Sequence, residues 1–295
     1  MKPYCEQIAR FGNHHHLSGI IAEPRDGQHD DKPAIVILNS GIIHRIGHHR
    51  MYVTMARWLA AAGYPVLRFD LSGIGDSANR SDSLAPELAA MDDIEAALNW
   101  LSETRDIKTA VLLGLCSGAD AALRYGYTDA RISSLVLLDP TTPPTWKFYA
   151  HYLGQRVTSL RSWRTFLRGR GRIWGDLIIR LLAAAGIPMI EARGRLIDPQ
   201  SRSELEALYE RSIEKNVNFL IVFTGGMAAY KEQLFDAFPS LRSSDQLTLE
   251  FLDGCDHIFT PPEHREKLNH LVLAFLRKTP SCERATVSAS AAQVS

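Results

Sequence analysis

The sequence predicts an α/β protein with an open, mostly parallel, doubly wound sheet and an inserted helical segment. Short apolar runs bounded by turn residues alternate with helical stretches of about three turns, and one long stretch interrupts this alternation. Such alternation is typical of parallel strands joined by helical crossovers. The chain of 295 residues, 45% apolar and 22% charged, is long enough and apolar enough to bury the core of such a sheet.

Each predicted strand is an apolar run that stops at turn residues. The first thirty residues have the pattern of a strand pair with a turn at Asn13. Later strands are expected at 34–38, 65–69, 110–113, 134–138, 219–223 and 247–252. Helical periodicity is found between them at 51–62, 91–103, 119–125 and 264–277. Because crossovers between parallel strands are short and right-handed, these elements predict an open doubly wound sheet.

Two segments fall outside the alternation and set the predicted domain boundaries. Residues 141–217 have helical character without a strand pattern, so residues 1–140 and 218–279 are expected to form the core and 141–217 an inserted cap. Between Thr145 and Gly175 the insertion has seven basic residues and no acidic ones. Residues 280–295 are rich in Ser and Ala and poor in large apolar residues, which predicts a disordered tail.

Charge, cysteine use and hydropathy exclude several classes of protein. Lys plus Arg and Asp plus Glu both number 33, and this balance argues against a dedicated nucleic-acid binder. Four cysteines without a CxxC pair favour neither a disulfide framework nor a structural zinc site, and we expect no metal or other cofactor.

Membrane and targeting signals are absent from the sequence pattern. The most apolar stretch, 177–190, is too short to span a bilayer and is interrupted by Arg180. It is interpreted as a half-buried helix, or as one that dips into a membrane surface or closes over an apolar substrate. The N-terminal residues have no apolar signal region, so the expected location is the cytoplasm.

The clearest catalytic motif is GLCSG at 114–118, between the strand expected at 110–113 and the helix expected at 119–125. A Gly-x-nucleophile-x-Gly motif that links a strand to a helix forms a very tight turn. A Cβ at either glycine of this turn would meet neighbouring backbone. Cys116 has glycine two positions before and after it, whereas Ser117 comes one position too late. The positive end of the following helix favours a thiolate. Cys116 is therefore the predicted nucleophile, the alternative being a small buried residue at a strand end.

His257 is the candidate base because it follows the last predicted strand and precedes the closing helix, the last place in the order nucleophile, acid, histidine. The acid is less obvious, since the loop after strand 219–223 has no carboxylate. Asp139, at the end of strand 134–138, is the favoured partner unless it only caps a following helix. The alternatives are Glu232 and a site without any acid. A Cys–His pair can act without an acid because its thiolate and imidazolium are already charged.

Two backbone N–H groups are expected to form an oxyanion hole. Ser117 supplies one, and the loop after the first parallel strand supplies the other, with Ile42 favoured over Ile43. The same loop contains residues that could bind a polar or anionic substrate group or be merely solvated: Gly41, Ile43, His44 and Arg45. Residues 70–77 (DLSGIGDS) are interpreted as a structural crossover in which Asp76 and Ser77 act as caps.

With this elbow the sequence resembles the α/β-hydrolase superfamily, and more closely the exosortase A system-associated hydrolase 1 family. The resemblance covers most of the chain up to about Lys278 and implies an α/β-hydrolase fold with Cys116 and His257 in matching positions. It is carried by the stretches 45–77 and 114–140, the Tyr/Arg/Trp-rich stretch 151–169, and GCDHIFT at 254–260. The chain departs from the family where Met227 lies near an expected Asp and Asp139 replaces an expected Asn. These departures are compatible with an acid that has moved to Asp139.

The predicted function is covalent acyl chemistry. The Cys116 thiolate attacks an ester or thioester of a small-molecule acyl group, and His257 protonates the leaving group and then activates water. The basic, aromatic insertion suits an acyl carrier protein or a phosphopantetheine arm, unless its Lys and Arg only solvate helix faces. A non-hydrolytic acyltransferase, an elimination (lyase) enzyme of natural-product assembly and a catalytically inactive binding protein are the alternatives. The sequence does not specify the acyl group or the acceptor, and a homodimer is possible.

Overall fold

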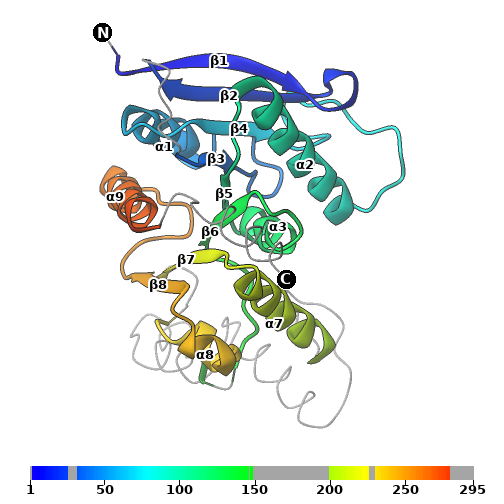
Figure 1. Cartoon of the computed structure of the whole chain (residues 1–295). Coiled ribbons are helices and arrows are strands. Elements are labelled where there is room, and N and C mark those ends of the chain that lie inside the picture. The colour runs from blue at the N-terminus through cyan, green and yellow to red at the C-terminus, as the bar shows by residue number, and fades with distance from the viewer. Residues whose placement is uncertain (1, 26–31, 146, 149–198, 226–229, 280–295) are drawn as a thin grey trace, which may run out of the picture.

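A computed structural model describes residues 2–25, 32–145, 147–148, 199–225 and 230–279 of the chain. Their strands form one twisted eight-stranded sheet in the order β1-β2-β4-β3-β5-β6-β7-β8 (Figure 1). The first strands along the chain pair as an antiparallel hairpin against β4, and the remaining pairs are parallel. The strands are β1 Tyr4–Phe11, β2 Leu17–Pro24, β3 Ala34–Ile37, β4 Val66–Asp70, β5 Ala110–Leu115, β6 Ile132–Leu138, β7 Asn218–Thr224 and β8 Leu247–Leu252.

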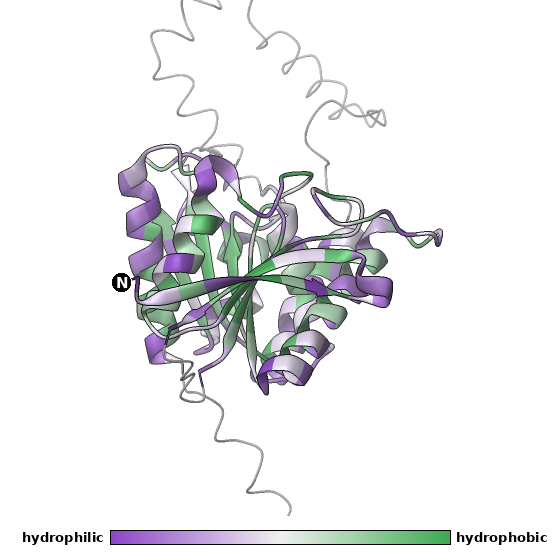
Figure 2. Cartoon of the chain, turned by 90° about the horizontal axis from the view of Figure 1, so that it is seen from above, coloured by the Kyte–Doolittle hydropathy of each residue, from purple (hydrophilic) through white to green (hydrophobic). Residues whose placement is uncertain are grey.

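Helices cover both faces of the sheet. Apolar residues of α1 (Met51–Ala61) and α9 (Pro262–Lys278) pack on one face. Those of α2 (Pro86–Arg105) and α3 (Ser117–Gly126) pack on the other. Seen from above, the apolar residues gather between the layers and the hydrophilic ones face outward (Figure 2). Alternating strands and helices with a mostly parallel sheet confirm the predicted doubly wound fold.

The predicted helical cap is described only at its ends. Residues 149–198 lie outside the described residues, as does the predicted tail at 280–295. The last part of the insertion forms α7 (Pro199–Glu214), which packs on the core. Its fully buried Tyr209 contacts Phe219 and Phe238 at ring-centroid distances of 5.6 and 5.7 Å. This stretch therefore belongs to the helical layer of the core.

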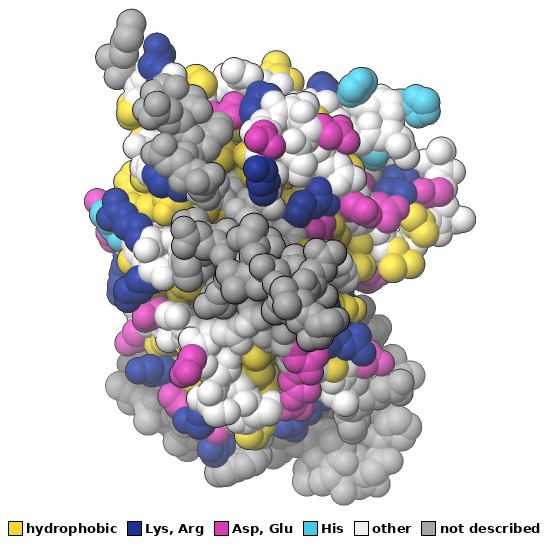
Figure 3. Space-filling view, in the orientation of Figure 1, with side chains coloured by type: hydrophobic (Ala, Val, Ile, Leu, Met, Phe, Trp, Pro, Cys, Tyr) yellow, Lys and Arg dark blue, Asp and Glu magenta, His cyan; other side chains and the backbone are white. Residues whose placement is uncertain are grey.

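On the face shown in Figure 3, the acidic and basic side chains of the described residues are interspersed, without a large patch of one charge sign. This matches the equal numbers of acidic and basic residues in the chain. No helix among the described residues is both long enough and apolar enough to cross a membrane.

The topology determines where the chemistry can lie. The carboxyl ends of neighbouring parallel strands meet at one edge of a sheet. At this edge β5 leads into Cys116, β6 into Asp139, and the loop after β8 into His257. Three residues far apart in the sequence are therefore expected at one place.

Candidate active site

Cys116 sits at a strained turn between β5 and α3. Its backbone has φ 57° and ψ −121°, a conformation that residues with a side chain rarely adopt. The turn is held by hydrogen bonds from the Cys116 N–H to the Leu138 carbonyl (2.9 Å) and from the Ala119 N–H to the Cys116 carbonyl (2.9 Å). The Cys116 side chain is exposed, so the turn presents its thiol at the edge of the sheet.

The two glycines of the motif are required by close backbone approach. A Cβ on Gly114 would lie 2.2 Å from the carbonyl carbon of Gly118, and a Cβ on Gly118 would lie 2.4 Å from the carbonyl oxygen of Asn39. Neither contact is tolerable, because backbone atoms cannot move aside as a flexible side chain can. The elbow inferred from the sequence is therefore the geometry that the chain adopts.

Asp139 and His257 are hydrogen bonded. His257 Nδ1 lies 2.8 Å from Asp139 Oδ2, with Nδ1 as the donor. Asp139 is buried at the end of β6, with φ 43°. Thr224, the last residue of β7, donates its N–H to Asp139 Oδ1 and its hydroxyl to Asp139 Oδ2, both at 2.7 Å. These hydrogen bonds fix the Asp139 carboxylate in an orientation that faces His257.

The pKa of His257 reflects its place between two groups. The hydrogen bond to Asp139 and then that to Cys116 raise the pKa of His257 to about 9, against the opposing effect of burial. His257 is therefore an imidazolium at neutral pH and is bonded to the carboxylate on one side and the sulfur on the other. A cysteine, a histidine and an aspartate thus form one connected line.

Glu232, the alternative acid, is engaged elsewhere. It precedes α8 (Gln233–Ala237) and forms an ion pair with Arg242 at 2.9 Å. Asp139 is therefore the carboxylate that the fold brings to His257. Sequence reasoning missed Thr224, although it ends the strand after which an acid was expected.

The two favoured oxyanion donors are available within the described residues. Ser117 is the first residue of α3, so its N–H has no acceptor within the helix. The Ile42 N–H also has no acceptor in the described chain, whereas the Ile43 N–H donates to the Ser40 carbonyl (3.1 Å). The Gly41 N–H donates to Ser117 Oγ at 2.6 Å, which fastens the loop to the elbow.

Arg45, a predicted substrate-binding candidate, forms ion pairs with two nearby carboxylates. Its N–H donates to Asp70 Oδ1 (2.6 Å), and its guanidinium bonds to Asp70 and to Asp76 (2.6 Å to the latter). The Arg45 side chain is only 11% exposed, and Asp70 is fully buried. The positive charge therefore braces the loop, and Asp76 pairs with Arg45 instead of acting as a cap.

His44 shares this cluster. Its Nε2 lies 3.3 Å from Asp70 Oδ2 and 3.5 Å from Asp76 Oδ2. Together these three side chains offer atoms of the kind that bind metal ions, but the Arg45 guanidinium already contacts both carboxylates. The arrangement is a structural ion-pair network.

His48 lies beside His257, on a loop that contacts the histidine loop. Burial, and then the positive charge of His257, lower the pKa of His48. Its neighbour His49 has φ 48° and places Nε2 3.4 Å from Thr260 Oγ1. A neutral imidazole therefore lies next to the charged one, a feature that the sequence alone did not single out.

Two polar residues that sequence reasoning missed hold the loops of the site. Buried Asn39 donates to the Ile43 carbonyl (2.7 Å) and so supports the oxyanion loop. Asp120 on α3 accepts hydrogen bonds from the N–H (2.8 Å) and hydroxyl (2.6 Å) of Thr141, two residues beyond Asp139. The helix that follows Cys116 and the turn at Asp139 are thereby joined.

Comparison with known proteins gives the family. Residues 30–191, more than half of the chain, match the family described as serine aminopeptidase, S33. A search of curated proteins gave no match.

Solved structures share the fold. An esterase of Pyrococcus furiosus is 15% identical, with a TM-score of 0.56 over 94% of this chain and 91% of its own. A hypothetical protein of Pseudomonas aeruginosa is 16% identical, with a TM-score of 0.59 over 95% of both chains. The esterase domain of a Rhodothermus marinus protein is 17% identical, with a TM-score of 0.54 over 92% of this chain and 98% of its own. The chain belongs to the serine aminopeptidase S33 family and is a hydrolase with the α/β-hydrolase fold.

Proposed function

We propose that the protein is a cysteine hydrolase that cleaves a thioester or ester through an acyl-enzyme on Cys116. The observation that carries the proposal is the line Cys116–His257–Asp139, in which the thiol occupies the strained elbow and the imidazole is charged at neutral pH. The resemblance to the exosortase A system-associated hydrolase 1 family supports a cysteine at this position.

The first half-reaction follows from the charges. The thiolate of Cys116 attacks the carbonyl carbon, a C–S bond forms, and the carbonyl oxygen becomes an oxyanion. The N–H groups of Ser117 and Ile42 donate to this oxyanion. As the carbonyl reforms, the bond to the leaving group breaks, and the leaving group takes a proton from His257. Asp139 accepts the hydrogen bond from His257 Nδ1 throughout.

The second half-reaction regenerates the site. His257, now neutral, removes a proton from water, and the resulting hydroxide attacks the acyl carbon of the thioester. Collapse of this second oxyanion breaks the C–S bond and releases the carboxylic acid. The thiolate of Cys116 and the imidazolium of His257 are restored.

Thioesters are the favoured substrates because of the proton that His257 has to give. A thiol has an ordinary pKa of about 8.5, so an imidazolium with a pKa of about 9 matches a leaving thiolate well. An amine leaving from a peptide bond must be protonated before the bond can break, which a weak acid does poorly. The proposal therefore places acyl thioesters first, esters second and peptides last.

Intact-mass measurement after incubation with short and medium acyl thioesters tests the proposal. An acyl adduct should appear in the wild type and be absent from Cys116→Ala. Cys5→Ala is the matched control, since Cys5 is a half-buried thiol on β1 at the opposite side of the fold. An adduct that decays in water supports hydrolysis, and one that persists until an amine or thiol is added indicates transfer. No adduct and no turnover with any thioester would refute covalent catalysis at Cys116.

A further inference from the structure

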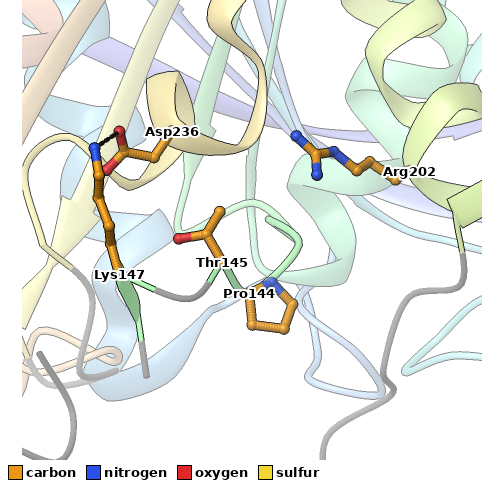
Figure 4. A pocket seen from close by; sticks show the side chains of 5 residues that line it. All are labelled: Pro144, Thr145, Lys147, Arg202 and Asp236. Atoms are coloured by element: carbon orange, nitrogen blue, oxygen red, sulfur yellow. Dashed lines mark hydrogen bonds and ion pairs between the residues drawn. The ribbon is translucent and has the colours of Figure 1, made fainter. Parts of the chain in front are cut away.

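A cavity of about 360 Å³ is lined by the segment that follows β6, by α7 and by α8 (Figure 4). Its lining residues are Pro144, Thr145, Lys147, Arg202 and Asp236. Cys116 and His257 are not among them, so the cavity is separate from the reacting groups. A volume of this size is at the lower end of small-molecule sites and suits one end of a ligand.

The cavity is nevertheless connected to the active site through two chain segments. Asp139 and Thr224 are hydrogen bonded at the strand ends, and six residues further along both segments the Thr145 and Tyr230 hydroxyls lie 3.1 Å apart. The two segments are therefore in contact at both of these positions. Six extended residues span at most about 20 Å, which bounds the distance from Asp139 to Thr145. An elongated substrate bound at Cys116 can reach this far.

One acid and one base in the cavity neutralise each other. Lys147 Nζ lies 2.6 Å from Asp236 Oδ1, and the Tyr230 hydroxyl donates to Asp236 Oδ2 at 2.8 Å. The hydrogen bond from Lys147, followed by that from Tyr230, lowers the pKa of Asp236, so this carboxylate is ionised. The pair contributes no net charge to the cavity.

Arg202 is the charge left over. It extends from α7 into the space beside Thr145 and donates one hydrogen bond to the Ala237 carbonyl (Figure 4). Within the described part of the chain Arg202 has no carboxylate partner. A guanidinium has five N–H donors in a planar fork that matches a carboxylate or phosphate. Among the described residues the cavity is therefore positive overall, and most of the Arg202 N–H donors have no acceptor there.

We propose that this cavity binds a carboxylate or phosphate group at one end of the acyl substrate and so determines which thioesters or esters the enzyme accepts. This inference rests on the proposed function for its catalytic readout. Arg202 is the recognition residue, Lys147 assists, and Asp236 limits the positive charge. The shared chemistry of the ligand is an oxyanion. The experiment below decides whether this oxyanion belongs to the acyl part of the substrate or to its leaving group.

Three substrates distinguish the sources of the anion. Hexanoyl N-acetylcysteamine thioester is neutral, its adipoyl analogue has a carboxylate on the acyl part, and hexanoyl phosphopantetheine has a phosphate on the leaving group. Arg202→Gln should raise KM about tenfold for whichever anionic substrate uses the cavity, the size expected when charge-assisted hydrogen bonds are lost. The kcat for that substrate, and both constants for the neutral one, should be unchanged.

Two further variants test the charge argument. Arg211→Gln makes the same change on the same helix, but at a residue that stacks on Tyr127 outside the cavity, and should change nothing. Asp236→Asn removes the negative charge and should lower KM for the anionic substrate. Equal KM changes for neutral and anionic substrates, an equal effect of Arg211→Gln, or no effect of Arg202→Gln would overturn the inference.

A binding measurement separates this inference from the proposed function. Calorimetric titration of Cys116→Ala with phosphopantetheine and with adipate needs no turnover. Binding of either that Arg202→Gln weakens about tenfold supports the cavity even if no acyl adduct forms on Cys116. If Cys116 is acylated but Arg202→Gln changes neither the binding of these ligands nor the KM of the anionic substrates, the hydrolase proposal stands and the subsite is refuted.

Discussion

Asp139→Asn is the most informative change, because it removes one charge and nearly preserves shape. The hydrogen bond from His257 to Asp139 is the largest cause of the raised His257 pKa, and Cys116 is the second. Burial of His257 opposes both. With Asp139 neutral, the pKa of His257 should fall from about 9 toward its ordinary 6.5.

The magnitude follows from those two pKa values. Near pH 8 the imidazolium fraction of His257 is about 0.9 for a pKa of about 9 and about 0.03 for a pKa of 6.5. Since in the proposed mechanism the imidazolium protonates the leaving group, kcat/KM should fall by up to about thirtyfold at this pH and by little near pH 5.5. Thirtyfold is the upper bound because Cys116 continues to raise the pKa of His257.

The assay is the pH dependence of kcat/KM for thioester hydrolysis by wild type and Asp139→Asn. In the wild type activity should decline above about pH 9, and in the variant this decline should begin at lower pH. Thr224→Val is the control, since it removes one hydrogen bond from Asp139 but keeps the carboxylate, and its basic limb should stay near that of the wild type. A loss for Asp139→Asn that is equal at every pH would refute the reasoning.

The same pKa shift predicts a stability effect. The difference between about 9 and 6.5 corresponds to roughly 3 kcal/mol at 1.36 kcal/mol per unit, for a side chain that is 25% exposed. Because the folded-state pKa is raised, this stabilisation is present below about pH 6.5 and lost as the pH rises through about 9. His257→Gln should therefore lower the free energy of unfolding in urea at pH 6 but not at pH 10, and an equal loss at both would contradict it.

Three further changes test the packing around the site by urea unfolding. Gly118→Ala should cost about 2 kcal/mol or more, because its Cβ would lie 2.4 Å from the Asn39 carbonyl oxygen, and a normal stability would contradict that contact. Arg45→Ala should cost roughly 3–5 kcal/mol because it leaves the buried Asp70 without its guanidinium partner, whereas a cost below about 1 kcal/mol would show that water replaces the guanidinium. Tyr209→Phe should be neutral or stabilising, since the buried hydroxyl has no partner within the described residues, and a loss above about 1 kcal/mol would reveal a hidden one.

The fold could be predicted because each strand is a contiguous apolar run. The run expected at 134–138 is observed as Ile132–Leu138, and that at 219–223 as Asn218–Thr224. Helix ends are less visible in the sequence. The helix expected at 91–103 extends over Pro86–Arg105, because Pro86 at its first turn begins a helix that apolar periodicity alone does not mark.

The roles of single polar residues could not be predicted, because they depend on distant partners. Arg45 in a basic loop has the pattern of an anion binder, yet Asp70 and Asp76 bind it across 25 and 31 positions of sequence. Asn39 follows β3 and Asp120 lies in the first turn of α3, and only the fold shows which loops they hold. The Cys116 motif was recognisable because its constraint is local: two glycines and a strained turn within five residues.

The position of Asp139 shows how the pairing register of β6 and β7 determines which polar groups meet at His257. Leu138 of β6 pairs with Val222 of β7, and the Asp139 N–H donates to the Val222 carbonyl at 2.8 Å. This register brings the end of β6 next to Thr224, whose N–H and hydroxyl bind the carboxylate. A threonine at the end of β7 cannot give His257 a negatively charged partner as a carboxylate does, but its N–H and hydroxyl can hold a neighbouring carboxylate. Neighbouring strands are about 4.8 Å apart, within reach of a side chain at a turn of positive φ. The carboxylate can therefore come from β6 without any change in the placement of His257, provided that β7 supplies donors in place of the acid.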